Sequence, residues 1–190
     1  MTGVEAVNVR SGWSRIARRI RVPLGFCFAV IYLWLAHPHP VSILSGSLIV
    51  AAGIGVRAIA SGQLKKNEEL ATSGPYSYTR NPLYLGSIVI AIGFAVVARN
   101  LWIWVLLFLL FIFIYVPTIS SEEAFLRLKF PDFDSYAHGV PRLLPRWSGQ
   151  SLTANFSREL YLKHREYNAL IGAALMMLAV TVKMLEVRSS

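Results

Sequence analysis

Five apolar segments run along this chain, separated alternately by short turns and by long polar stretches. They cover about residues 22–36, 41–60, 82–98, 101–117 and 168–185. A helix needs roughly 17–25 apolar residues to span a bilayer core, so each segment crosses or nearly crosses a membrane. Period-2 alternation is absent, and backbone groups in lipid must be hydrogen-bonded within their own segment. The pattern predicts an all-α polytopic membrane protein with about five transmembrane helices, forming a single domain over residues 1–190.

The composition supports this class. The chain is 55% hydrophobic and only 15% charged, and a soluble domain of this length does not hide so much apolar surface. Its net charge of +9 is explained without nucleic acid, because the basic residues gather before the first segment and in the long polar stretches 61–81 and 118–167. This is the positive-inside pattern. We expect a bacterial inner-membrane or endoplasmic reticulum protein with a cytoplasmic N-terminus and its C-terminus on the opposite side.

Two polar features fall outside these basic stretches. Arg57 lies inside the second apolar segment, and His37-Pro38-His39-Pro40 connects the first two segments. The histidines suggest a metal site, but the sequence offers no other candidate ligand on that membrane face, so we favour a turn stiffened by proline and expect no metal. The single cysteine, Cys27, excludes a disulfide within one chain.

The third and fourth apolar segments are separated only by Arg99 and Asn100. This spacing predicts a tight antiparallel helical hairpin. The hairpin brings the polar stretches 61–81 and 118–167 together at one membrane face. We therefore expect a cytoplasmic site where a soluble cofactor meets a lipophilic substrate and membrane lipids.

The first polar stretch ends at the start of a helix. Pro82 suits the first helical turn, and Asn81 suits the N-cap position before it. The free N–H groups of the helix start, together with the Arg80 guanidinium, form a site for a carboxylate or phosphate. The alternative is that Arg80 only anchors the helix at the lipid headgroups.

The second polar stretch places Glu122 and Glu123 just past the fourth apolar helix. Paired carboxylates there can accept hydrogen bonds from ribose, attract a cation or accept a proton. The alternative is a structural role in salt bridges to Arg80, Arg127 or Lys129.

Four blocks occur in order: Gly-Pro-Tyr at 74–76, Arg-Asn-Pro-Leu-Tyr-Leu-Gly at 80–86, Glu-Glu at 122–123 and Val-Pro-Arg-x-x-Pro at 140–145. This order resembles the isoprenylcysteine carboxyl methyltransferase and phospholipid methyltransferase superfamily over about residues 53–145. The resemblance implies S-adenosyl-L-methionine as cofactor and methyl transfer to a lipophilic substrate from the bilayer. That substrate is the carboxylate of an isoprenylcysteine-like acid or an amine of a phospholipid. The helix at about 168–185 is an addition beyond the matched region.

The resemblance also implies roles for individual residues. We expect Arg80, Glu123 and Tyr136 to act in catalysis, Arg80 by holding a carboxylate and the other two as candidate bases for an amine. The expected cofactor-binding residues are Gly53, Gly55, Tyr78, Arg80, Asn81, Pro82, Tyr84, Gly86, Glu122 and Glu123.

The chain departs from the family pattern in three places. Asn81 stands where the family usually has His, which removes an ionisable ring but keeps a hydrogen-bonding group. Pro131 replaces a Gly, and Gly139 stands where eukaryotic carboxyl methyltransferases carry a basic residue. Two other functions remain as alternatives: an NADPH-dependent membrane reductase related to sterol reductases, and a non-catalytic lipid-binding membrane protein.

Overall fold

The computed structural model describes residues 25–65, 68–153 and 156–189, and in this part of the chain it contains helices and no strands. The all-α prediction is confirmed. The basic residues between Arg10 and Arg21 lie outside the described residues. The described elements are the helix Gly25–Leu35, α2 Pro40–Ser61, α3 Pro75–Tyr78, α4 Pro82–Ala98, α5 Leu101–Leu110, the π-helical turn η2 Phe111–Tyr115, α6 Val116–Lys129, α7 Phe133–Gly139, α8 Arg158–Lys163 and α9 Tyr167–Ser189.

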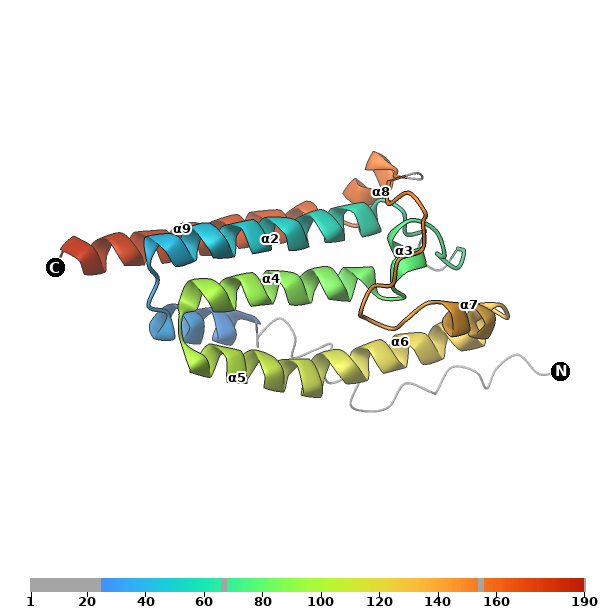
Figure 1. The fold of residues 1–190 in the computed structure, drawn as a ribbon, viewed down its shortest axis with the longest axis horizontal. Coiled ribbons are helices and arrows are strands. Elements are labelled where there is room, and N and C mark those ends of the chain that lie inside the picture. The colour runs from blue at the N-terminus through green and yellow to red at the C-terminus, as the bar shows by residue number, and fades with distance from the viewer. Residues whose placement is uncertain (1–24, 66–67, 154–155, 190) are drawn as a thin grey trace.

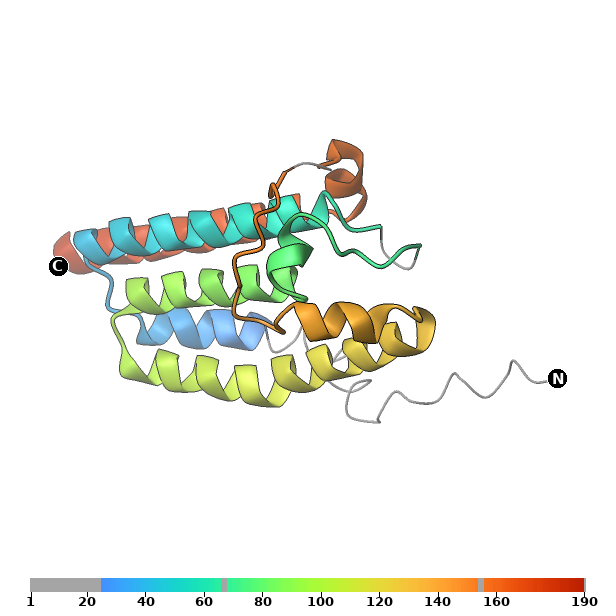
Figure 2. The same ribbon diagram turned by 45° about the vertical axis from the view of Figure 1, so that its right-hand side comes forward.

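Three of the described helices are long and apolar enough to cross a membrane: Pro40–Ser61, Leu101–Lys129 and Tyr167–Val187. Two shorter apolar helices, Gly25–Leu35 and Pro82–Ala98, lie among them. Figures 1 and 2 show all five side by side with their long axes roughly aligned. This arrangement fits the expected five membrane segments.

Helices α2 and α4 pack together through glycines. Gly46 faces Gly93, and one heptad further along Gly53 faces Gly86. A Cβ atom added at Gly53 would lie 2.8 Å from the Gly86 carbonyl oxygen, so only glycine permits this approach. Small residues allow membrane helices to pack with their backbones in contact. These glycines therefore fix the antiparallel α2–α4 pair that underlies the site.

The predicted hairpin is present, since α4 ends at Ala98 and α5 begins at Leu101. Arg99 adopts the left-handed conformation with φ 49°, and the Asn100 side chain caps α5 by accepting from the Trp102 N–H at 2.9 Å. However, α4 packs more extensively along α2 than along α5.

The fourth apolar helix does not end near Pro117, and this prediction is wrong. The helix continues to Lys129 through the turn η2, where the Val116 N–H donates to the Phe111 carbonyl. Pro117 has no N–H and its ring crowds the preceding turn, and the wider π-helical turn just before it accommodates the ring without ending the helix. Glu122 and Glu123 consequently lie on a polar extension of this helix.

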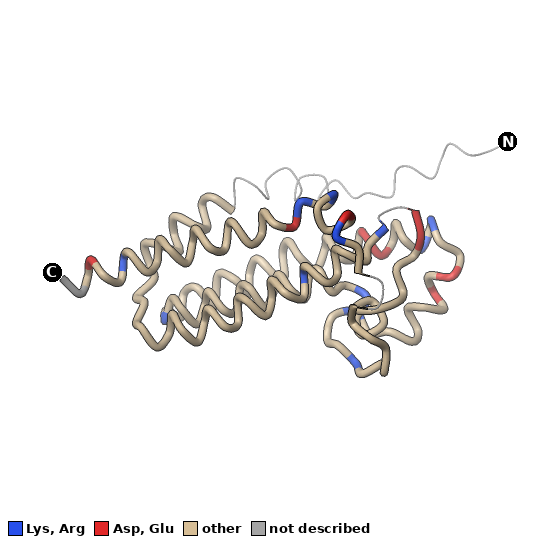
Figure 3. Tube along the Cα trace, turned by 90° about the horizontal axis from the view of Figure 1, so that it is seen from above, with Lys and Arg blue, Asp and Glu red and all other residues tan. Residues whose placement is uncertain are grey.

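Charged residues concentrate at one end of the helices, where α3, α6, α7 and α8 meet (Figure 3). At the other end, His39 caps α2 by accepting from the Val41 N–H at 3.4 Å, and no group of three or more potential metal ligands occurs among the described residues. The two polar stretches do meet at one end of the molecule. That this end is cytoplasmic stays a prediction.

Candidate active site

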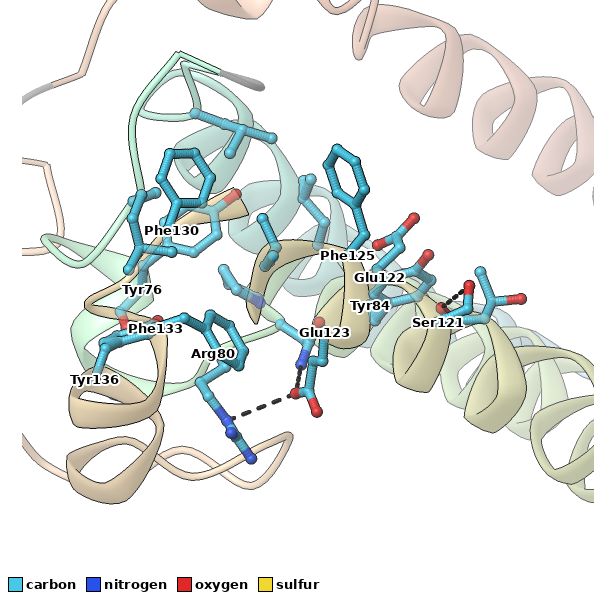
Figure 4. Close-up of a pocket in the computed structure, with 18 of the residues that line it drawn as sticks. Tyr76, Arg80, Tyr84, Ser121, Glu122, Glu123, Phe125, Phe130, Phe133 and Tyr136 are labelled. Atoms are coloured by element: carbon cyan, nitrogen blue, oxygen red, sulfur yellow. Dashed lines mark hydrogen bonds and ion pairs between the residues drawn. The ribbon is translucent and has the colours of Figure 1, made fainter. Parts of the chain in front are cut away.

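A cavity of about 420 Å³ opens at the charged end of the molecule, a size typical of small-molecule sites. Its walls come from Leu64, residues 69–71, α3, the start of α4, α6 and α7 (Figure 4). Most of the predicted site residues line it: Arg80, Asn81, Pro82, Tyr84, Glu122, Glu123 and Tyr136.

The buried Glu123 joins the two polar blocks. Its Oε1 atom accepts from Asn81 Nδ2 at 3.0 Å and lies 3.6 Å from Arg80 Nε. Its Oε2 atom lies 3.1 Å from Arg142 Nε. Asn81 occupies the N-cap position of α4, but its side chain makes no capping bond and instead also donates to the Arg142 carbonyl at 3.0 Å. Glu123 thus holds the start of α4, helix α6 and the return segment together.

Glu122 has a different environment from its neighbour. Its side chain is exposed, lines the cavity and makes no hydrogen bond or ion pair within the described part of the chain. The structural alternative therefore fits Glu123, whereas Glu122 is open to a ligand. Arg127 pairs instead with Asp134 at 2.6 Å.

Tyr136 and Tyr76 have different environments at the cavity. The Tyr136 hydroxyl donates to the Tyr76 backbone carbonyl at 2.7 Å, which ties α7 to α3. Tyr76 itself is 7% exposed, lines the cavity, and its hydroxyl has no partner among the described residues. Burial raises the pKa of the Tyr76 hydroxyl, and Tyr136, Glu166 and Glu122 raise it further. It therefore stays protonated and able to donate.

Tyr76 was missed as a site residue, although it belongs to the Gly-Pro-Tyr block. A buried polar atom without a partner is rare in proteins, which makes this hydroxyl a candidate ligand contact. Figure 4 shows Tyr76 and Phe130 on one side of the cavity, with Phe125 and Glu122 on the other.

Four predicted cofactor-binding residues do not line this cavity. Gly53 and Gly86 lie at the α2–α4 contact. Gly55 faces open space, with no neighbouring atom within 4 Å of an added Cβ. Tyr78 donates its hydroxyl to the Gln150 carbonyl and packs edge-on against Trp147.

A second, mostly apolar cavity of about 700 Å³ lies between the helix Gly25–Leu35, α4, the α5–η2 helix and the start of α9. Among the described residues, Arg57 and Ser87 alone line both cavities. Arg57 Nε donates to Glu166 Oε2 at 3.0 Å. Arg57 Nη2 donates to Glu166 Oε1 at 2.9 Å and to Oε2 at 2.7 Å. Arg57 Nη1 also donates to the Ser87 hydroxyl. Glu166 was missed because it lies more than a hundred residues from its partner in sequence.

The charges lining the first cavity are unequal. Two guanidinium groups face four carboxylates, from Arg57, Arg80, Glu69, Glu122, Glu123 and Glu166. Lys65 neutralises Glu69 at 3.0 Å, and Arg142 contributes to the pairing of Glu123. With these two neighbours counted, the cations balance the carboxylates, and Glu122 is the lining carboxylate without an ion pair among the described residues, which makes it the candidate partner for a cationic group of a ligand.

Comparison with known proteins adds to this geometry. Residues 43–132 match the model of the phospholipid methyltransferase family. The chain is 34% identical over 113 residues to the nickel-cobalt-cadmium resistance protein NccN of Alcaligenes xylosoxydans xylosoxydans, covering 55% of this chain and 53% of that protein. It is also 34% identical over 113 residues to the cobalt-zinc-cadmium resistance protein CzcN of Cupriavidus metallidurans, covering 55% and 52%.

A third relative is the protein-S-isoprenylcysteine O-methyltransferase of Schizosaccharomyces pombe. It is 33% identical over 103 residues, covering 54% of this chain and 44% of that protein. The chain spans about half the length of the curated relatives it matches. No solved structure matches it.

Proposed function

Because the chain belongs to the superfamily of phospholipid and isoprenylcysteine methyltransferases, we propose that it transfers a methyl group from S-adenosyl-L-methionine to a lipophilic acceptor. Its apolar helices make it an integral membrane protein. The reaction takes place at the polar end of the helices, where the two cavities meet.

The first cavity suits the cofactor chemically. S-adenosyl-L-methionine carries a sulfonium and an ammonium, for which the Glu122 carboxylate is a candidate partner, and one carboxylate. Arg80, beside the start of α4, is placed to bind that carboxylate. Tyr76 and Phe130 supply aromatic surface for the adenine ring, and Glu122 offers a free acceptor for ribose hydroxyls or the amino group.

When bound, the cofactor supplies an electrophilic methyl group on sulfur. The protein's contribution is to bind, orient and exclude water, since alignment of the reacting atoms supplies a large part of the rate enhancement. Glu123 has a positioning role here, because it keeps Arg80 and Asn81 in place through the contacts described above.

The second cavity suits the hydrocarbon part of the acceptor. Its lining is predominantly apolar and it lies between membrane helices, so a lipid chain is accommodated there without entering water. The family match supports methyl transfer over the reductase alternative.

The single observation that carries this proposal is the buried Tyr76 hydroxyl, which lines the cavity beside Glu122 and has no hydrogen-bond partner among the described residues. Calorimetric titration of S-adenosyl-L-methionine into the purified protein in lipid nanodiscs tests it. We expect saturable binding that Glu122→Gln weakens and Glu159→Gln, the same change at an exposed position outside both cavities, leaves unchanged. A folded wild-type protein that does not bind the cofactor contradicts the proposal and favours the reductase or the lipid-binding protein.

A further inference from the structure

The chain between α7 and α8 returns to the level of the membrane helices. Figures 1 and 2 show this stretch bending back from α7 and running beside the start of α4 before it reaches α8. Helix α4 is apolar from Pro82 to Ala98, so its start lies where the hydrocarbon layer meets the polar end. Side chains exposed on residues 141–147, the return segment, therefore lie at the depth of the lipid headgroups.

The return segment is both basic and apolar. Its sequence Pro-Arg-Leu-Leu-Pro-Arg-Trp contains two arginines and no acidic residue. Leu144 is 81% exposed and Trp147 is 84% exposed, although both side chains are large and apolar. Such exposure to water is unfavourable, whereas tryptophan and basic residues are enriched where a membrane protein meets the headgroups. The composition of the segment thus fits contact with a lipid surface.

The positive charge of the return segment is not neutralised. Arg146 is exposed, and its side chain makes no hydrogen bond or ion pair within the described part of the chain. Arg142 is 40% exposed and shares Glu123 with Arg80, at 3.1 Å and 3.6 Å from the two carboxylate oxygens. Two guanidinium groups therefore face one carboxylate. One positive charge from this cluster and one from Arg146 remain for an anionic partner.

Hydrogen bonds hold the return segment in place at both of its ends. The Arg80 N–H donates to the Pro141 carbonyl at 2.9 Å, and the Arg146 N–H donates to the Tyr78 carbonyl at 2.9 Å. The Trp147 ring also packs edge-on against the Tyr78 ring, with 5.8 Å between the ring centroids. Because the backbone is already ordered, a ligand that binds here does not have to order a free loop.

We propose that the return segment binds the headgroup of an anionic phospholipid such as phosphatidylglycerol. The phosphate pairs with Arg142 and Arg146 through charge-assisted hydrogen bonds, and the acyl chains cover Leu144 and Trp147. A zwitterionic lipid offers the same chains but no net charge, so it binds more weakly. The return segment lines neither cavity, and this inference does not depend on the proposed function.

Trp147 allows the lipid contact to be measured directly. The full chain is placed in nanodiscs in which either phosphatidylglycerol or phosphatidylcholine carries brominated acyl chains, which quench nearby indole fluorescence. The difference between the wild type and Trp147→Phe isolates the quenching of Trp147. We expect Trp147 to report at least fivefold preference for phosphatidylglycerol, because one arginine at an anionic surface contributes about 1 kcal/mol, or about fivefold in affinity.

The other two outcomes of this measurement overturn the proposal. Equal quenching of Trp147 by the two brominated lipids shows an apolar contact without preference for anionic headgroups. An absence of quenching by both lipids places Trp147 outside the bilayer and favours a protein partner for the return segment.

Arg146→Gln tests the role of charge. We expect the preference for phosphatidylglycerol to fall at least threefold, whereas Arg158→Gln, which removes the same charge from the exposed start of α8, changes it less than twofold. An equal fall in both variants shows a general charge effect and overturns the assignment to the return segment. Native mass spectrometry of the wild type and Arg146→Gln measures retained phosphatidylglycerol without the Trp147→Phe variant, and equal retention also overturns the proposal.

Discussion

The Tyr136 hydroxyl donates to the backbone carbonyl of Tyr76 at 2.7 Å, while the hydroxyl of Tyr76 itself has no partner among the described residues. Tyr136 therefore holds the short helix α3 against α7, and Tyr76 is the tyrosine that we propose contacts the cofactor. The proposal gives the two residues separable roles, structural for Tyr136 and binding for Tyr76.

Tyr76→Phe removes the unpartnered hydroxyl and nothing else. Because no hydrogen bond is lost and a buried polar atom disappears, we expect thermal stability to stay the same or rise. The affinity for S-adenosyl-L-methionine should fall about tenfold, as expected for the loss of one hydrogen bond to a ligand. Calorimetry and thermal unfolding in the same nanodiscs measure both quantities.

Tyr136→Phe is the matched control. It breaks the bond to the Tyr76 carbonyl, so the melting temperature should fall by about 2–4 °C for roughly 1 kcal/mol. Equal effects of the two substitutions on stability, with no difference in cofactor affinity, would contradict the division of roles.

The glycines at 53 and 55 should respond differently to substitution by alanine. A Cβ at position 53 meets the Gly86 oxygen and the Ile90 nitrogen at 2.8 Å, whereas a Cβ at position 55 meets nothing within 4 Å. Gly53→Ala forces α2 and α4 apart and should cost about 1–3 kcal/mol. Gly55→Ala should leave the unfolding temperature unchanged. Loss of cofactor binding in a stable Gly55→Ala protein would instead restore this glycine to the binding site.

The neighbouring residues Glu122 and Glu123 should also differ in their response to substitution by glutamine. Glu123→Gln leaves Arg80 and Arg142 without their shared carboxylate, and breaking such a buried pair costs about 3 kcal/mol. Glu122→Gln removes no contact within the described structure, so its stability should match the wild type while cofactor affinity falls. Thermal unfolding and calorimetry on both variants distinguish these outcomes, and a Glu123→Gln protein as stable as wild type would show that the ion pairs contribute little.

Local chemistry made most of the fold predictable from the sequence. Helix α4 begins and ends as predicted, because Pro82 and the Arg99-Asn100 turn define its ends. The end of the fourth apolar helix was not predictable from Pro117, since a π-helical turn that accommodates a proline has no residue-level signature. In the site, the hairpin spacing correctly predicted that the polar blocks containing Asn81 and Glu123 lie close together.

The remaining site features depend on tertiary contacts. Arg57 gave a signal as an isolated charge in an apolar segment, but its partner Glu166 lies on the other side of a long intervening stretch. The lack of a hydrogen-bond partner for the Tyr76 hydroxyl among the described residues is known only once the neighbouring polar groups are placed. The spacing of residues in the sequence does not reveal which of two polar side chains has its hydrogen bonds satisfied within the protein.

Asn81 provides the last prediction, because it stands where the family usually has His. Its amide nitrogen donates to Glu123 Oε1 and to the Arg142 carbonyl, each at 3.0 Å. A neutral imidazole has a single N–H, so Asn81→His keeps one of these two bonds and should cost about 1 kcal/mol. Cofactor binding should be retained, because the contact with Glu123 does not require an ionisable ring.

Asn81→Asp is the sharper variant, since it has nearly the same shape but no donor. It places a second carboxylate against Glu123, and repulsion together with the lost bonds should cost about 3 kcal/mol and abolish cofactor binding. Thermal unfolding should rank the proteins as wild type, then Asn81→His, then Asn81→Asp. An aspartate variant that is as stable as the wild type would contradict the role of Asn81 as donor to Glu123, because aspartate has no amide hydrogens to donate and adds a negative charge beside Glu123.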